Sequence, residues 1–326
     1  MLGIAFAGFR HGHIYSLYNE VNNNENTKLC GAWENDDAAR AEAAANNGVE
    51  FTYSTYAELL ADKNVDIVAI GDYFGARGKL VIEALKAGKN VITDKPICTS
   101  IDELDEIERL VKETGLKVGC MLDLRHCKFA DTLKKLYKNG SLGEINTISF
   151  TGQHPLNYGT RAGWYFEEGK HGGTINDISV HGIDLIAAVF GLRVKNVCSA
   201  REWNKYASKV PYFMDSAMFM VELDNGAHVM SDVTYAVPDG HGFALPQYWR
   251  FTIWGTKGMV EFNLYGDDMM VALKGDPVVK RILCEESTET NLKDFIRELA
   301  GEECEYNTEF TLRSARDVLT IQKAAE

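Results

Sequence analysis

The chain has 326 residues, 45% of them apolar, and carries a formal net charge of −13. This length and apolar content allow a large buried core and predict about two domains at roughly 150 residues per domain. The acidic balance repels a phosphate backbone, so we expect no nucleic-acid partner.

No segment supplies the roughly 18 consecutive apolar residues of a membrane helix, and the N-terminal residues lack the pattern of a signal peptide. We therefore expect no membrane partner. The seven cysteines form no CxxC motif and no paired spacing. This predicts reduced thiols, a cytoplasmic location and neither a zinc knuckle nor a disulfide framework.

The first third of the chain alternates short apolar runs with amphipathic helical patterns. Such alternation predicts a doubly wound parallel sheet covered by helices on both faces. Glycines at 88 and 115 fit left-handed caps at two of the helix ends. The expected strands are 4–8, 28–33, 65–71, 90–94 and 116–122, and the expected helices are 13–21, 37–47, 55–63, 76–88 and 100–115.

From about residue 147 longer alternating strands predict a large, predominantly antiparallel sheet. The turn at Asp224, Asn225 and Gly226 indicates a hairpin. One helix, which follows two glycines and ends at Gly191, interrupts the strands. We place the domain boundary near Met121–Arg125, which divides the chain into residues 1–122 and 123–326.

The segment GFRHGHI after the first strand is placed like a dinucleotide-binding loop, although Arg10 and His13 occupy two of the three usual glycine positions. The amides at a helix N-terminus attract anions whatever the side chains are. The alternative is an ordinary turn with polar surface residues. Gly8, Phe9, Arg10, His11, Gly12 and His13 are the predicted loop residues.

Glu34 directly follows the second strand, where a carboxylate accepts both ribose hydroxyls of NAD and repels the extra phosphate of NADP. We therefore expect NAD. NADP is the less favoured alternative, in which Arg10 would bind the extra phosphate. Asp36 and Asp37 compete with Glu34 for this role, or else cap the following helix.

Two further stretches carry reactive groups. In NVITDKP, Asp94 and Lys95 lie at the carboxyl end of a predicted strand, where open α/β sheets bind ligands. In GGTINDISVHGIDL, Asp177, His181 and Asp184 have helical spacing among apolar neighbours. A polar stripe on a buried helix needs partners or a pocket.

Simpler interpretations of these stretches stay open. Lys95 is alternatively a solvated loop lysine. Thr174 and Asp177 have the spacing of a capping box, and His181 is alternatively a core histidine with satisfied hydrogen bonds. His171 and His241 lack the spacing of strong zinc motifs, so we expect no metal site.

Taken together, these residues resemble the Gfo/Idh/MocA oxidoreductase family. The resemblance rests on the Gly8 loop, AGKNVITDKP, GSLGEI, GGTINDISVHGIDL and GTKGMVEF. Besides the loop glycines, the chain departs from the family pattern in having Asp94 for glutamate, Tyr73 for proline and Arg77 for histidine.

The resemblance implies a Rossmann domain followed by an α/β domain whose open sheet forms a homodimer or homotetramer interface. It assigns catalysis to Lys95, Asp177 and His181, and adds Asp72, Tyr73, Arg77, Asp94 and Lys95 to the cofactor site. We expect hydride transfer between NAD and a hydroxyl carbon of a sugar, polyol or related molecule.

His181 suits the role of the base that accepts the hydroxyl proton, and Lys95 that of stabilising the alkoxide. We expect Lys95, Tyr158, Arg161, Trp164, Asp177 and His181 to contact the substrate. Tyr158 and Trp164 alternatively pack in the sheet or in a subunit interface. Alternatives for the whole protein are an NAD-assisted lyase or glycosidase without net redox change, and a dinucleotide-binding sensor.

Overall fold

The structure is a computed structural model that describes all residues 1–326. The chain forms two compact units. The first comprises Met1–Leu122, Gly169–Gly172 and Asn291–Arg316. The second comprises Asp123–Glu168, Gly173–Thr290 and Asp317–Glu326.

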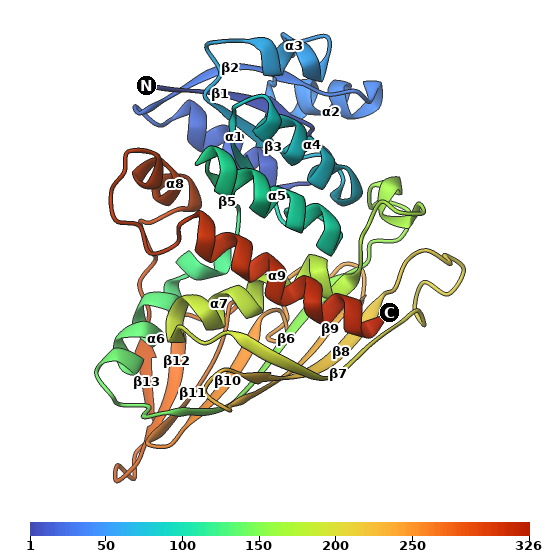
Figure 1. Cartoon of the computed structure of the whole chain (residues 1–326). Helices are drawn as coiled ribbons and strands as arrows, with labels where there is room; N and C mark the ends of the chain where they lie inside the picture. Colours follow the sequence, from blue (N-terminus) through green and yellow to red (C-terminus); the bar gives the residue numbers. More distant parts are fainter. The chain divides into compact units, whose positions relative to one another are not determined.

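The first unit is built on a five-stranded parallel sheet with the strand order β2-β1-β3-β4-β5 (Figure 1). The strands are almost continuously apolar because a parallel sheet is buried on both faces. This confirms the predicted doubly wound sheet. The strands are β1 (Leu2–Ala7), β2 (Thr27–Trp33), β3 (Ile67–Ile70), β4 (Asn90–Thr93) and β5 (Val118–Cys120).

Helices follow these strands at the predicted places. They are α1 (His13–Asn22), α2 (Asp37–Asn47), α3 (Tyr56–Ala61), α4 (Phe74–Lys86) and α5 (Ile101–Thr114). Gly88 and Gly115 have φ of 79° and 73°, the left-handed conformation expected after a helix.

One late segment of the chain completes the core of the first unit. Helix α8 (Asn291–Leu299), red in Figure 1, places Leu292 and Phe295 in the hydrophobic cluster built around β1 and α1. Gly119 in β5 makes room for this helix, since an added Cβ would lie 2.9 Å from the Phe295 ring.

The second unit contains an eight-stranded sheet with the order β13-β12-β11-β10-β6-β9-β8-β7. Every neighbouring pair is antiparallel except β6 and β9, which are parallel. The predominantly antiparallel sheet is thus confirmed, as is the hairpin, where Gly226 has a φ of 84°. The strands are β6 (Ile145–Pro155), β7 (Val194–Trp203), β8 (Ser216–Leu223), β9 (His228–Val237), β10 (Arg250–Gly255), β11 (Gly258–Asn263), β12 (Asp268–Leu273) and β13 (Lys280–Leu283).

Helix α7 (Val180–Phe190) is the interrupting helix that the sequence predicted. Every one of its residues is buried, and it ends at Gly191 with a φ of 70°. Its close approach to the sheet depends on Gly182, where an added Cβ would lie 2.4 Å from the ring of Phe150 in β6. The other regular helices are α6 (Lys128–Lys138) and α9 (Thr308–Ala325).

Two further features of the chain are its helix lengths and its cysteines. None of the helices combines the length and apolar character that crossing a membrane requires. No disulfide joins any of the seven cysteines.

Candidate functional site

The loop after β1 has the backbone shape that a dinucleotide-binding turn needs. Gly8 has a φ of 84°, and a Cβ there would lie 2.6 Å from the backbone nitrogen of Asp72. Only glycine fits such a position. Gly12, the N-cap of α1, faces open space, and no side chain caps the helix. The first turn of α1 is therefore suited to an anionic group.

Glu34 links the loop after β1 to the end of β2 through its side-chain hydrogen bonds. The carboxylate is fully buried and accepts the Phe9 amide at 2.8 Å and the Asp36 amide at 3.0 Å. Arg10 Nη1 lies 3.4 Å from Glu34 Oε1 and 3.3 Å from Asp36 Oδ2, so the guanidinium forms ion pairs with both carboxylates. Asp36 also caps α2 through the Ala39 amide, which confirms the capping alternative for that residue.

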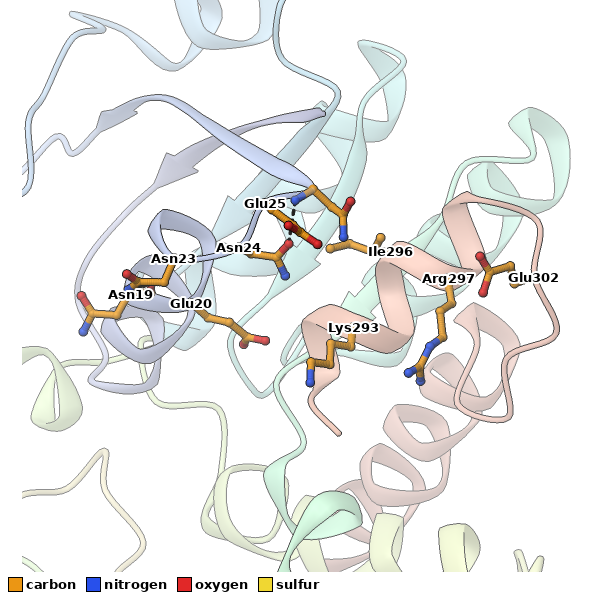
Figure 2. Close-up of a pocket in the computed structure, with 10 residues that line it drawn as sticks. Asn19, Glu20, Asn23, Asn24, Glu25, Lys293, Ile296, Arg297 and Glu302 are labelled. Atoms are coloured by element: carbon orange, nitrogen blue, oxygen red, sulfur yellow. Dashed lines mark hydrogen bonds between the residues drawn. The ribbon is translucent and has the colours of Figure 1, made fainter. Parts of the chain in front are cut away.

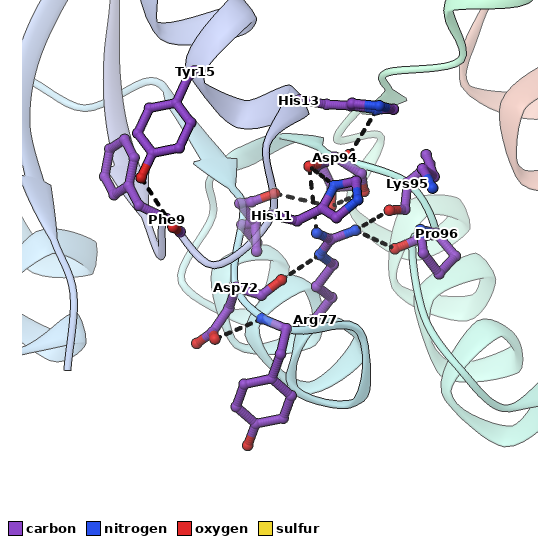
Figure 3. A network of polar contacts seen from close by, with 12 residues as sticks. Phe9, His11, His13, Tyr15, Asp72, Arg77, Asp94, Lys95 and Pro96 are labelled. Carbon is purple, nitrogen blue, oxygen red and sulfur yellow. Dashed lines mark hydrogen bonds and ion pairs between the residues drawn. The ribbon is translucent and has the colours of Figure 1, made fainter. Parts of the chain in front are cut away.

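A polar cluster surrounds Asp94 at the carboxyl end of β4 (Figure 3). His11 Nδ1 lies 2.7 Å from one carboxylate oxygen, Oδ2, and His13 Nδ1 lies 3.4 Å from the other, Oδ1. Arg77 Nη2 lies 3.5 Å from Oδ2. The two histidines of the loop thus face the residue that precedes Lys95.

Charge and burial set the protonation of this cluster. Burial alone raises the pKa of the Asp94 carboxyl, but His11, Arg77 and His13 outweigh it and hold that pKa well below its usual value. Burial lowers the pKa of His11 to about 4, against the opposing effect of Asp94. At neutral pH the cluster therefore holds an ionised carboxylate and an uncharged His11.

Arg77 holds the backbone around Lys95. The guanidinium is fully buried and donates to the carbonyl oxygens of Asp72 at 2.7 Å and Pro96 at 3.3 Å, and to that of Lys95. It thereby joins the turn before α4 to the turn after β4. Lys95 is 5% exposed, and its Nζ lies 5.5 Å from the centre of the Phe74 ring.

Asp72 and Tyr73 lie at the carboxyl end of β3. Burial, reinforced by the charge of Glu34, raises the pKa of Asp72 to about 6. Its carboxylate accepts the Tyr73 amide at 2.7 Å. The Tyr73 ring has Lys170 Nζ at 5.0 Å and the Arg10 guanidinium at 6.0 Å from its centre.

In the second unit, Asp177 lies in a single π-helical turn, Ile175–Ser179, directly before α7. Such turns occur frequently at functional sites. Asp177 accepts a hydrogen bond from the Tyr235 hydroxyl. Thr174 donates instead to the Met214 carbonyl and makes no side-chain cap, so the capping-box alternative is wrong.

The start of this helical segment is capped from another strand. Glu202 in β7 accepts the amides of Thr174 at 2.7 Å and Ile175 at 3.0 Å. A carboxylate is favourable at this end of a helix because the exposed amides carry partial positive charge. Glu202 thus positions the turn that carries Asp177.

His181 follows in the first turn of α7. It is buried, and its ring packs edge-on against Trp249 with centroids 5.6 Å apart. Trp249 has a φ of 51°, which is a strained conformation for a bulky residue. Such strain is concentrated at functional sites. Gly152 in β6 leaves room for the Trp249 side chain.

Asp184, the third polar residue of the stripe, has a structural partner. Arg125 binds its carboxylate through Nε at 2.8 Å and Nη2 at 2.6 Å, and both residues are buried. This bidentate ion pair compensates the buried negative charge of Asp184. The stripe therefore contains one structural ion pair and two candidate functional residues.

The residues predicted to contact substrate differ in their surroundings. Tyr158 is 57% exposed, whereas Trp164 is buried against Tyr165 with ring centroids 4.1 Å apart. Arg161 donates to the carbonyl oxygens of Pro155 and Leu156 at 2.6 and 2.7 Å. Its guanidinium lies over the rings of Tyr165 and Tyr235, which favours packing for this segment.

Sequence reasoning missed Tyr235, Trp249 and Glu202. Each contacts a predicted helical segment from a strand or strand end far away in the chain. No local spacing signals these contacts, although the strand pairing of β6 to β9 brings Tyr235 toward the helix that contains Asp177.

A separate hollow of about 750 Å³ lies between α1 and α8 in the first unit (Figure 2). Its lining includes Asn23 and Asn24 after α1, Lys293 and Arg297 of α8, and the acidic residues Glu20 and Glu302. It contains none of the predicted site residues.

Comparison with known families decides the membership of the chain. The model of the oxidoreductase family with an NAD-binding Rossmann fold matches residues 2–121, and that of the Gfo/Idh/MocA C-terminal domain matches residues 130–261. The chain belongs to the Gfo/Idh/MocA family. This confirms the resemblance found in the sequence.

Two relatives are named as dehydrogenases and a third as an uncharacterized oxidoreductase. A scyllo-inositol 2-dehydrogenase (NAD⁺) of Bacillus subtilis is 26% identical over 68% of this chain and 62% of its own length. Levoglucosan dehydrogenase of Pseudarthrobacter phenanthrenivorans is 25% identical over 74% of this chain and 66% of its own. An uncharacterized oxidoreductase of B. subtilis, YrbE, is 24% identical over 66% and 60%. The chain thus spans less than two thirds of these relatives' lengths.

Solved structures agree over the whole chain. A putative oxidoreductase from Erwinia carotovora atroseptica superposes with a TM-score of 0.88 and 24% identity, covering 100% of this chain and 99% of that one. Levoglucosan dehydrogenase in complex with NADH and levoglucosan gives 0.81 and 20%, covering 99% and 97%. These similarities confirm the fold.

Proposed function

We propose that this protein is an NAD-dependent dehydrogenase that oxidises a CH–OH group of a sugar, polyol or related small molecule. The observation that carries the proposal is the buried Lys95 at the carboxyl edge of a parallel sheet, in a domain that matches the NAD-binding Rossmann family. Residues 1–122 would bind the dinucleotide, and residues 123–326 would bind substrate and mediate assembly.

The residues present fit a dinucleotide. The Gly8 turn and the first turn of α1, which no side chain caps, suit a diphosphate, and His11 and His13 border the same loop. Glu34 directly follows β2, at the place where this fold binds a ribose, and Arg10 lies 3.4 Å from its carboxylate. A 2′-phosphate beside the buried Glu34 carboxylate would be repelled, which favours NAD over NADP.

NAD supplies a nicotinamide ring that takes up the hydride released from the carbinol carbon. The substrate hydroxyl must lose its proton as the hydride leaves. An imidazole titrates near neutral pH, so His181 is suited to accept that proton. Lys95 would stabilise the developing alkoxide. Asp177, held by Tyr235, would bind a neighbouring hydroxyl.

The named relatives support the substrate class. They include dehydrogenases of scyllo-inositol and levoglucosan, both of which are polyhydroxylated rings. Sugars of this kind have an apolar C–H face, which aromatic side chains bind. Tyr235 donates to Asp177, and the ring of Tyr165 lies 6.4 Å from that of Tyr235 between centroids.

The test is NADH formation over a panel of inositols and anhydrosugars. Wild type should reduce NAD⁺ with at least one member, and Lys95→Ala should abolish the reaction. Lys79→Ala is the matched control, because Lys79 is highly exposed on α4. Substrate conversion without NADH release would instead indicate a lyase or glycosidase that uses NAD transiently. NAD binding without conversion of any substrate would indicate a sensor.

We also propose that the second unit forms a homo-oligomer through its open sheet. A hollow of about 770 Å³ over strands β6 to β9 is lined in part by Met218 and Met230, which are 52% and 61% exposed. Exposed apolar patches of this kind mark interaction surfaces. Met218→Glu together with Met230→Glu should reduce the mass measured by light scattering to that of a monomer. An unchanged mass would reject this interface.

A further inference from the structure

Two histidines and one aspartate of the first unit form a cluster with the composition of a metal site. We propose that His11, His13 and Asp94 bind a divalent transition-metal ion, with Zn²⁺ as the reference ion. One ligand atom from each residue lies within 4.8 Å of the other two. The donor set of two imidazoles and a carboxylate is one that Zn²⁺ and Fe²⁺ accept in proteins.

The distances suit a shared ion. Ligands of tetrahedral Zn²⁺ at about 2.0–2.1 Å lie roughly 3.3 Å from one another. His13 Nδ1 is 3.4 Å from Asp94 Oδ1, and His11 Nδ1 is 2.7 Å from Oδ2. The three ligand atoms lie within 4.8 Å of one another, so rotations of the two imidazole rings would bring them around one ion.

The chain holds these ligands in place before any ion binds. His11 and His13 come from the turn that Gly8 shapes, where the amides of Arg10 and His11 donate to the Gly71 carbonyl. Asp94 is fully buried at the end of β4. The His13 side chain is 38% exposed, which leaves a route for an ion and a position for water.

Arg77 and Lys95 are the positive charges that oppose a cation here. The Arg77 guanidinium directs its donors to the carbonyl oxygens of Asp72, Lys95 and Pro96, and its Nη2 lies 3.5 Å from Asp94 Oδ2, whereas Asp94 Oδ1 accepts no hydrogen bond. Oδ1, on the His13 side, is the oxygen suited to the ion. Arg77 would then orient the carboxylate, as partners of metal ligands commonly do.

This proposal departs from the expectation of no metal site. The sequence shows only a His-x-His pair, because the third ligand lies 83 residues from His11. The strand order β1-β3-β4 brings the ends of β1 and β4 to the same edge of the sheet.

The experiment is a titration of chelator-treated full-length protein with Zn²⁺ by calorimetry, without dinucleotide. Wild type should bind one equivalent, and His13→Ala should weaken binding by at least about tenfold. His228→Ala, which removes an exposed histidine of β9, should bind like wild type. Circular dichroism and thermal melting confirm that each variant is folded.

X-ray absorption of the zinc-loaded wild type provides a second measurement that needs no variant. It should show two imidazoles and an oxygen ligand. Zinc binding that His13→Ala leaves unchanged, absorption without two imidazoles, or no binding at all would overturn the proposal. Because dinucleotide is absent, these outcomes are independent of the proposed dehydrogenase activity.

Discussion

Replacing Asp72 by asparagine should stabilise the protein at neutral pH. The Asp72 carboxylate is buried and lies near the charge of Glu34. Burial and this charge together raise its pKa from 3.8 to about 6. A raised carboxyl pKa means that the folded state prefers the protonated form. The stability that this form contributes is present at low pH and is lost as the pH rises from about 4 through 6.

The shift sets the size of the effect. A difference of about 2 pKa units corresponds to roughly 3 kcal/mol, which is the penalty of ionising Asp72 in the folded protein at pH 7. At pH 4 the same shift leaves only about 0.5 kcal/mol. Asparagine is uncharged at both pH values and still accepts the Tyr73 amide. Asp72→Asn should therefore raise the free energy of unfolding by up to about 3 kcal/mol at pH 7.

The assay is urea unfolding of wild type and variant at pH 4 and pH 7, followed by circular dichroism. The difference between the proteins is the quantity of interest, because the lowered pKa of His11 gives the wild-type curve an opposing slope. Asp224→Asn, in the exposed hairpin turn, is the control. A variant that is less stable than wild type at pH 7, or a difference that does not change with pH, would refute the reasoning.

Three other predictions test separate parts of the structure. Lys95→Ala should lower kcat far more than it weakens NAD binding measured by calorimetry, and unchanged turnover would reject a catalytic role. Arg125→Met should cost about 3–5 kcal/mol in urea unfolding because it strands the buried Asp184 charge, and adding Asp184→Leu should recover most of the loss. Gly182→Ala should cost about 1–3 kcal/mol by forcing a Cβ onto the Phe150 ring, and an unchanged melting temperature would contradict the close packing of α7.

The parallel sheet and its helices could be predicted because their signals are local. Continuous apolar runs mark β1 to β5, and left-handed glycines follow α4 and α5. In the second unit, alternation and the turn at Gly226 predict β8 and β9 in the same way. The sequence does not predict strands β12 and β13 or helices α6, α8 and α9, although α8 completes the core of the first unit.

The site residues depend on contacts that spacing does not encode. The spacing of Asp177, His181 and Asp184 indicates one polar stripe, but only Arg125, 59 positions before Asp184, makes the last of them a structural residue. The family resemblance assigns Arg77 to the cofactor site, and the structure adds that its donors reach the backbone beside Lys95. Such roles follow from tertiary neighbours and not from residue type.

The most direct test of the central claim uses a polyol that carries deuterium on every carbinol carbon. Incubation of wild-type protein with NAD⁺ and this substrate should give NADH with one deuterium from the substrate, and Lys95→Ala should give none. NADH without deuterium, or no NADH with any member of the inositol and anhydrosugar panel, would contradict the proposed dehydrogenase.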